Sequence, residues 1–374
     1  MINAHALSKW TLAGITAATL MACGGSNEPS SNTETQAAAP AKTETIEWKM
    51  VTTWPKNFPA LGTGAEQLAQ SINAMSGGRI HVKVYAAGEL VPALEAFDAV
   101  SRGTAQISHG ASYYWKGKVP AAQFFTTVPY GLTAQEMNSW LTQGGGMELW
   151  EEVYEPFNVM PLAAGNSGTQ MGGWFNKEIN SVADLNGLKM RMPGLGGEVL
   201  ADAGVTVVNM PGSEMFTALQ TGTIDATEFV GPYNDLAFGL YKAAKYYYYP
   251  GWQEPGSAIE TVINKDAFTA LPEDLQLIVR AAARQANAEM LDEFTAKNNS
   301  ALETLVNEHG VILKRFPDDV LAEFRASTDE VMDKVAANDP MSQKVYDSMK
   351  DFKEKVMKWS DISERAFVNA RAAE

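Results

Sequence analysis

The sequence predicts an α/β protein built of two lobes. Its first patterned stretch reads strand, helix, strand, helix, which is the order expected for a sheet covered by helices. The body spans about 330 residues, more than a single hydrophobic core usually serves. A long helical pattern, with apolar residues near helical spacing, also runs from about residue 272 to 308.

The first 22 residues predict a signal peptide. Lys9 precedes a mostly apolar run from Trp10 to Met21, which is too short to span a bilayer. The run ends in Leu20-Met21-Ala22-Cys23-Gly24, which resembles the lipobox of bacterial lipoproteins. We therefore expect lipidation of Cys23, the only cysteine, with a buried free thiol as the alternative.

The segment 23–44 contains small and polar residues and predicts a disordered tether between the lipid and the body. The formal net charge of −15 argues against nucleic-acid binding, because a basic face would supply most of that affinity. An anionic ligand would therefore need a local positive group or a bound cation.

Apolar spacing predicts the elements of the first lobe. Residues 46–51 and 80–85 alternate as strands do, and helices are expected over 63–75 and 92–102. The segment 110–130 then gathers six aromatic side chains in a loop-rich region. Such density is typical of ligand clefts, and ordinary core packing is the alternative.

Two later strands each end beside a charged residue. Residues 181–192 predict a short helix, an Asn-Gly turn and a strand that presents Arg191 near its end. A helix over 211–223 leads into a strand over 224–230 that carries Glu228. Arg191 and Glu228 are therefore both expected at strand ends.

The C-terminal part is predicted to be mainly helical. The long helix over 272–308 is followed by a strand at 311–316 and by a charged helical tail from residue 318. Five apolar residues of the tail form a heptad-like stripe: Val345, Met349, Phe352, Val356 and Trp359. The stripe covers fewer than three heptads, so a homodimer and packing on the chain's own body both stay open.

The sequence does not contain the common catalytic motifs considered below. The four histidines are scattered, and none has zinc-ligand spacing. The sequence has no G-x-S-x-G motif, and its one cysteine lies in the export signal. Gly194-Leu195-Gly196-Gly197 lacks the Lys-Ser/Thr pair of a phosphate loop. We therefore expect a binding protein and not an enzyme.

Two segments carry a family resemblance: Leu185-Asn186-Gly187-Leu188-Lys189-Met190-Arg191, and Ala218-Leu219-Gln220-Thr221-Gly222-Thr223-Ile224-Asp225-Ala226-Thr227-Glu228. They resemble the substrate-binding subunits of TRAP transporters, the DctP-type solute-binding protein family 7, and the resemblance covers nearly all of the body. It implies a periplasmic protein that closes on a small organic acid and delivers it to membrane permease subunits.

The implied fold is a type II-like periplasmic binding protein with a long domain-spanning helix and C-terminal helices. On that fold we expect lobe 1 at residues 45–165 and 256–316, and lobe 2 at residues 166–255. The C-terminal helical segment is then 317–374.

The resemblance also implies a ligand site. In that family an arginine at the position of Arg191 grips the ligand carboxylate, which suits a planar guanidinium that donates two parallel hydrogen bonds. This chain is most similar to the branch that binds 2-oxo acids such as pyruvate, or lactate, together with a cation. Gln170, Glu228, Phe229 and Glu254 stand at the matching positions, and their oxygens would hold sodium or calcium.

Some of these positions have alternatives. Phe229 stands where the family has a tryptophan, but only its main-chain carbonyl is needed. Glu254 could instead cap a strand or bond the far end of the ligand. Trp54, Tyr113 and Tyr114 are candidates for the wall beside the apolar end of the ligand, with core packing as the alternative.

Two other functions stay open from the sequence. The first is binding of a larger ligand without a metal, such as a dicarboxylate, a sugar acid or an ectoine-like solute. The second is a periplasmic lyase that uses Glu228 and Glu254 as acid and base.

Overall fold

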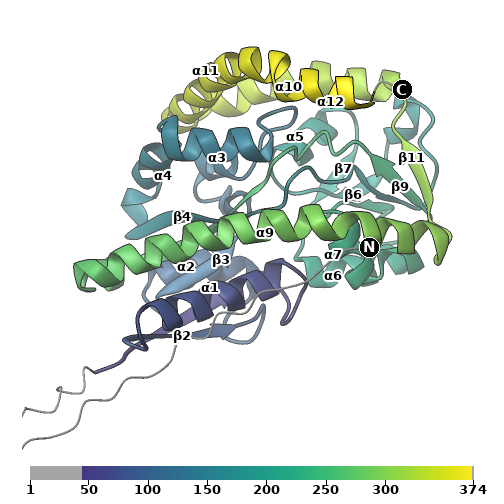
Figure 1. Ribbon diagram of the computed structural model, residues 1–374. Helices are drawn as coiled ribbons and strands as arrows, with labels where there is room; N and C mark the ends of the chain where they lie inside the picture. Colours follow the sequence, from purple (N-terminus) through teal and green to yellow (C-terminus); the bar gives the residue numbers. More distant parts are fainter. Residues whose placement is uncertain (1–43, 373–374) are drawn as a thin grey trace, which may run out of the picture. The chain divides into compact units, whose positions relative to one another are not determined.

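The computed structural model describes residues 44–372, which fold as one compact unit. The predicted signal peptide, the tether and Cys23 lie outside the described residues. Two sheets with helices packed on them confirm the α/β class, and the ribbon in Figure 1 shows the long helix and the C-terminal helices that were expected.

The first sheet has five strands in the order β2-β1-β3-β10-β4. Its strands are β1 (Ile46–Thr52), β2 (Ile80–Tyr85), β3 (Ile107–Gly110), β4 (Val159–Asn166) and β10 (Ala258–Asn264). Strands β1, β2 and β3 are parallel, and β10 runs antiparallel between β3 and β4. Every residue of β10 is buried, as its central position requires.

The second sheet has six strands in the order β11-β9-β5-β8-β6-β7. Its strands are β5 (Gly173–Phe175), β6 (Lys189–Arg191), β7 (Thr206–Val208), β8 (Ala226–Thr227), β9 (Tyr246–Tyr249) and β11 (Ile312–Arg315). The predicted lobe boundaries differ from this pairing in one place. They assign residues 311–316 to lobe 1, whereas β11 pairs with β9 in the second sheet.

Most of the predicted helices are present near their predicted spans, and several further helices lie where none was predicted. They are α1 (Leu61–Met75), α2 (Ala96–Ser101), α3 (Ala134–Gln143), α4 (Gly146–Tyr154), α5 (Gly194–Asp202), α6 (Gly212–Gln220), α7 (Pro232–Phe238), α8 (Lys265–Thr269), α9 (Glu273–Asn307), α10 (Asp318–Ala337), α11 (Pro340–Ile362) and α12 (Glu364–Ala372). The short helix expected before Arg191 is a 3₁₀ turn over Val182–Leu185. The strand expected over 224–230 shrinks to the two residues of β8.

Helix α9 connects the two sheets. Its 35 residues extend about 50 Å at 1.5 Å per residue, and Figure 1 shows it running across the width of the fold. Leu275 and Val279 pack into the cluster on the first sheet, and Leu305 packs into a cluster on the second. Met290 and Phe294, between them along the helix, join a third cluster that contains residues from both sides.

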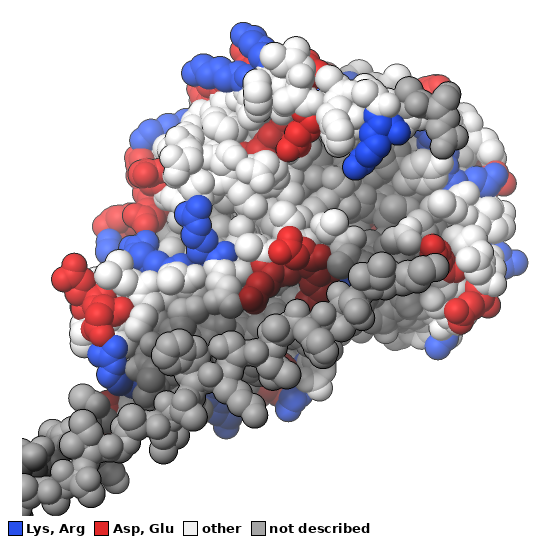
Figure 2. All heavy atoms as spheres, in the orientation of Figure 1, with Lys and Arg blue, Asp and Glu red and all other residues white. Residues whose placement is uncertain are grey.

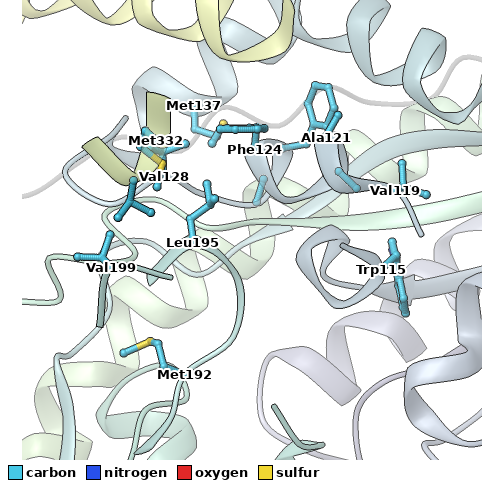
Figure 3. Close-up of a cluster of buried hydrophobic side chains, with 14 of the residues drawn as sticks. Trp115, Val119, Ala121, Phe124, Val128, Met137, Met192, Leu195, Val199 and Met332 are labelled. Carbon is cyan, nitrogen blue, oxygen red and sulfur yellow. The ribbon is translucent and has the colours of Figure 1, made fainter. Parts of the chain in front are cut away.

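The C-terminal helices pack on the chain's own body. In Figure 3, Met332 of α10 lies with Met137 and Val128, close to Leu195 and Val199 of α5. In the tail stripe Val345 and Met349 are buried in the same cluster, and Phe352 and Val356 pack against it. Trp359 at the far end is 66% exposed.

Across the described residues, no helix is both long and apolar enough to cross a bilayer. On the face that Figure 2 shows, acidic and basic side chains are interspersed and do not gather into one basic stripe.

The carboxyl group of Glu260 is buried in the middle of β10. Trp115 Nε1 and Tyr154 OH both donate to it, the latter at 2.8 Å from Oε2, and burial raises its pKa to about 8. Between pH 4.5 and about pH 8 the carboxyl of Glu260 is therefore protonated in the folded state. In the unfolded state, where its pKa is 4.5, it is ionised over the same range. The contribution of Glu260 to stability should consequently fall as pH rises from about 5 to about 8.

We predict that Glu260→Gln removes this penalty, because the amide resembles the protonated carboxyl. The melting temperature of the variant should rise relative to the wild type as pH goes from 5 to 8, with a slope of up to about 1.4 kcal/mol per pH unit in unfolding free energy. Calorimetry over this range measures it. Two melting curves that stay parallel with pH would contradict the argument.

Candidate functional site

Arg191 and Glu228 lie side by side because two parallel strands end together. β6 pairs with β8 in a register that places Arg191 opposite Thr227, so Glu228 is the first residue beyond β8. The main-chain N–H of Glu228 donates to the carbonyl of Arg191 at 3.1 Å. Both side chains are fully buried, and their predicted places at strand ends are confirmed.

The guanidinium of Arg191 is only partly paired. Its Nη1 donates to the main-chain oxygen of Glu228 at 2.5 Å and lies 3.4 Å from Oε2 of the same residue. Its Nε donates to the carbonyl of Met210 at 3.4 Å, and its carbon lies 5.6 Å from the centre of the Phe229 ring. Nη2 is buried and has no hydrogen-bond partner among the described residues. The Nη2 atom of the guanidinium, with its two N–H groups, is therefore available to an acceptor.

Gln170 reaches the same place from the loop between β4 and β5. Its main-chain N–H donates to the carbonyl of Glu254 at 3.0 Å, and that of Met171 donates to the carbonyl of Val230 at 2.9 Å. The amide Nε2 donates to Ser167 Oγ at 2.9 Å. Its Oε1 is buried and, within the described chain, accepts no hydrogen bond.

Two glycines allow these segments to approach one another. A Cβ at Gly251 would lie 2.0 Å from the main-chain oxygen of Gln170, which no side chain could tolerate. Gly194 has a φ of +64°, and a Cβ there would press on the Tyr113 ring at 3.1 Å. Glycine is needed at both positions, in the first for space and in the second also for backbone conformation.

Burial shifts the acidic groups of the site toward their protonated forms. It raises the pKa of Glu228 well above its usual value, and the charge of Glu254 adds to the effect while Arg191 opposes it. Burial also raises the pKa of Glu254 to about 7, although Ser257 Oγ donates to its Oε2 at 2.5 Å. Asp235, the third buried carboxyl, has a pKa raised to about 6 by burial.

An aromatic wall, formed by Trp54, Tyr113 and Tyr114, borders the charged groups. The ring centroids of Tyr113 and Tyr114 lie 4.8 Å apart, and those of Trp54 and Tyr114 lie 6.3 Å apart. The pKa values of both tyrosines are raised by burial first and are also sensitive to the charges of Glu254 and Arg191. The wall is therefore close to the carboxylates, and its two tyrosines are neutral phenols at physiological pH.

A loop from the first sheet closes against the segment that follows β8. The Phe58 ring lies 5.9 Å from that of Phe229 and 4.2 Å from that of Phe238, between centroids. Asn234 Nδ2 in α7 donates to the carbonyl of Pro59 at 2.8 Å. These contacts hold residues of the two sheets around the same buried site.

The free atoms of the site suit a hard cation and an anion together. Gln170 Oε1 and Glu228 Oε1 are oxygen acceptors without partners, which is the donor type that sodium and calcium prefer. The guanidinium of Arg191 faces Glu228. The charges of Glu254 and Asp235 also influence the pKa values of this pair. The described residues contain no cluster of three or more His, Cys, Asp or Glu suited to a metal, so a cation here would need amide or main-chain oxygens in addition to carboxylate oxygens.

Three neighbours of this site were missed by the sequence reading. Gln253 Nε2 donates to the carbonyl of Met171 at 2.8 Å, and His109 accepts from Trp54. Asp235 accepts from Trp174 and Tyr247. No motif marked them, and only the position of Gln253 beside Glu254 offered a signal.

Two sizeable hollows lie away from these residues. One of about 660 Å³ lies between the loop 128–133 and helices α10 and α11, and another of about 790 Å³ lies along α9 beside α3 and α4. Neither includes Arg191 or Glu228. Cavity volume alone would therefore indicate a site away from the buried charged residues.

The chain matches a protein family over most of its length. Residues 50–339 match the model of DctP, described as bacterial extracellular solute-binding protein, family 7. A monocarboxylate 2-oxoacid-binding periplasmic protein of Nostoc sp. is 43% identical over 326 residues, which cover 87% of this chain and 88% of that protein.

Solved structures agree with this match. A TRAP periplasmic solute-binding protein of Pseudoalteromonas atlantica with bound sodium and pyruvate is 42% identical, with a TM-score of 0.85 over 88% of this chain and 100% of that one. One from Bordetella bronchiseptica is 36% identical, with a TM-score of 0.86 over 87% of this chain and 97% of that one. The latter is described as a mixed-occupancy dimer with copurified calcium and picolinate in the occupied site.

Proposed function

The chain belongs to the DctP family of bacterial extracellular solute-binding proteins, and on that basis we propose that it captures a small 2-oxo or 2-hydroxy monocarboxylate together with a cation. Pyruvate and lactate are the reference ligands. Members of this family bind substrates for transport and are not enzymes, so a lyase role for Glu228 and Glu254 has no support.

The observation that carries the proposal is the set of unpaired polar atoms at one buried place. Arg191 Nη2 offers a donor, and Gln170 Oε1 and Glu228 Oε1 offer acceptors, all from residues at most 5% exposed. Leaving buried polar atoms unpaired is costly, so the complete site includes further partners. An anion paired with a cation supplies both missing types at once.

In this proposal Arg191 binds the ligand carboxylate through its free edge. The cation binds Gln170 Oε1, the carboxylate of Glu228 and the main-chain carbonyl of Phe229, and the carboxylate and 2-oxygen of the ligand complete its shell. Glu254 contributes a fourth oxygen or bonds the ligand directly. When bound, the cation neutralises the carboxylate that would otherwise repel an anionic ligand.

The aromatic wall favours a short ligand. Trp54, Tyr113 and Tyr114 place three aromatic rings beside the site, and apart from the indole N–H that His109 accepts, the polar groups of this wall are neutral hydroxyls. A second carboxylate would lose its water there without gaining a cationic partner. The dicarboxylate and sugar-acid alternatives are therefore disfavoured.

We predict that binding of 2-oxo acids depends on added cation. In calorimetric titrations of the tether-free body, pyruvate should bind in buffer containing sodium or calcium and should bind at least about tenfold more weakly after removal of both. Ligand-bound protein should also melt at higher temperature, because the ligand binds only the native state. A response confined to dicarboxylates or sugar acids, unaffected by chelator, would refute the ligand and the cation site.

Two variants serve as controls for this experiment. Arg191→Lys keeps the charge but removes the planar fork, so affinity should fall by about 2 kcal/mol or more at saturating cation. Glu228→Gln keeps the shape but removes the charge that holds the cation, so the dependence on cation should weaken. Equal pyruvate affinity in all three proteins would contradict these roles.

We further propose that the protein is held at the membrane by a lipid on Cys23 and delivers its ligand to TRAP permease subunits. The lipobox-like sequence at residues 20–24 supports the anchor, and the family supports the partner. Protein purified from membranes should carry a diacylglyceryl group at Cys23, which intact mass measures. The Cys23→Ser variant should lack the lipid, so the protein should appear in detergent-free extracts. A mature chain without lipid would contradict the anchor.

We also propose a homodimer through the end of the C-terminal helices. Trp359, Ile362 and Phe367 are 62–74% exposed near the junction of α11 and α12, and the related Bordetella protein is described as a dimer. Trp359→Glu combined with Phe367→Glu should convert the dimer to monomer in analytical ultracentrifugation. Leu277→Glu, at an equally exposed apolar position on α9, is the matched control and should leave the mass unchanged. A monomeric wild type would refute the dimer.

A further inference from the structure

The only polar atom of the Trp54 side chain is hydrogen-bonded within the protein. The indole Nε1 donates to His109 Nδ1 at 2.8 Å, and the two rings meet edge to face with centroids 6.3 Å apart. Trp54 is 2% exposed and His109 has no exposed surface. His109 belongs to β3, where it pairs with Thr52 of β1 and with Thr261 of β10, so its backbone is fixed on both sides.

The partners of His109 define its tautomer. An indole nitrogen can only donate, so Nδ1 must carry the lone pair and Nε2 must carry the proton. Nε2 lies 3.4 Å from the carbonyl of Ala164 on β4, which can accept that proton's hydrogen bond. Burial lowers the pKa of His109 to about 4, so the ring stays neutral and keeps its acceptor at physiological pH.

From this geometry we infer that His109 is a positioning residue that sets ligand specificity, because it holds Trp54 with its N–H turned away from the site and only ring surface toward it. The inference rests on the proposed monocarboxylate function. It adds a residue that does not touch the ligand and acts through Trp54.

The hydrogen bond between Trp54 and His109 affects which ligands the site can bind. With the indole N–H occupied by His109, Trp54 offers no hydrogen-bond donor to the site, and the tyrosine hydroxyls are the only donors of the wall that a second carboxylate could meet. If Trp54 lost its acceptor, its N–H would be a buried donor without a partner, and reorientation toward the site would relieve that cost. A ligand with a carboxylate at its far end would then gain a charge-assisted hydrogen bond.

Two matched substitutions separate the acceptor from the rest of the side chain. His109→Asn places an amide oxygen at the same distance along the side chain as Nδ1, so Trp54 keeps an acceptor. His109→Gln places its polar atoms one bond further out, at the level of Nε2, so the hydrogen bond to Trp54 is lost while the polarity is kept. Both should fold, which thermal unfolding checks.

The experiment is the ratio of dissociation constants for 2-oxoglutarate and pyruvate, measured by titration calorimetry at saturating cation. We expect His109→Gln to lower this ratio about tenfold or more and His109→Asn to keep it within about twofold of the wild type. In a Trp54→Phe background, which has no indole N–H, His109→Gln should change the ratio by less than about twofold.

Each outcome bears on the inference. An unchanged ratio in His109→Gln, or an equal loss of both ligands, refutes the positioning role while pyruvate binding by the wild type leaves the proposed function standing. The same shift in the Trp54→Phe background also refutes it, because His109 would then act without the indole. A wild type that binds no 2-oxo acid refutes the proposed function and this inference with it.

Discussion

The buried ion pair of Arg191 and Glu228 is the constraint on which the site depends. Both side chains lie entirely within the protein, where an ion pair alone does not recover the cost of leaving water. The pair is also unbalanced, because Glu254 and Asp235 add two more buried carboxyl groups that act on it. A buried cluster with this imbalance of charge is stable only where other atoms or bound ions neutralise it. This is the expected property of a binding site.

The fold supplies this arrangement through strand ends rather than through a deep hollow. Parallel strands β6 and β8 bring Arg191 and Glu228 together at their carboxyl ends, the usual place for ligands in α/β folds. The loop before β5 adds Gln170, and Gly251 lets the segment carrying Glu254 pass against its backbone. The aromatic wall comes from the segments that follow β1 and β3 of the first sheet, so the proposed site lies where elements of both sheets meet. Helix α9 packs behind them with Met290 and Phe294 and holds the two sides together.

Local sequence predicted what depends on local chemistry. Period-two alternation located β1 and β2, and the strand ends at Arg191 and Glu228 followed from short motifs. Tertiary pairing was harder to predict. β11 joins the second sheet because its main chain registers with β9, about 65 residues earlier, and nothing in its own residues indicates that choice. His109 and Asp235 were missed for a similar reason, since each matters through a partner distant in sequence, Trp54 for the first and Trp174 for the second.

Phe229 illustrates how the proposed site can accept a different side chain at a position that contributes only a main-chain oxygen. The proposed contribution to the cation is the main-chain carbonyl, which any residue supplies. The side chain has separate tasks: its ring packs edge to face against Phe58 and Phe238 and lies 5.6 Å from the guanidinium carbon of Arg191. Phenylalanine serves these as tryptophan would, because both offer a ring face to a cation and apolar area to neighbours. In the proposed site the residues that cannot be exchanged are those whose side-chain atoms would bind directly, so Arg191 and Glu228 constrain that site and the ring of Phe229 does not.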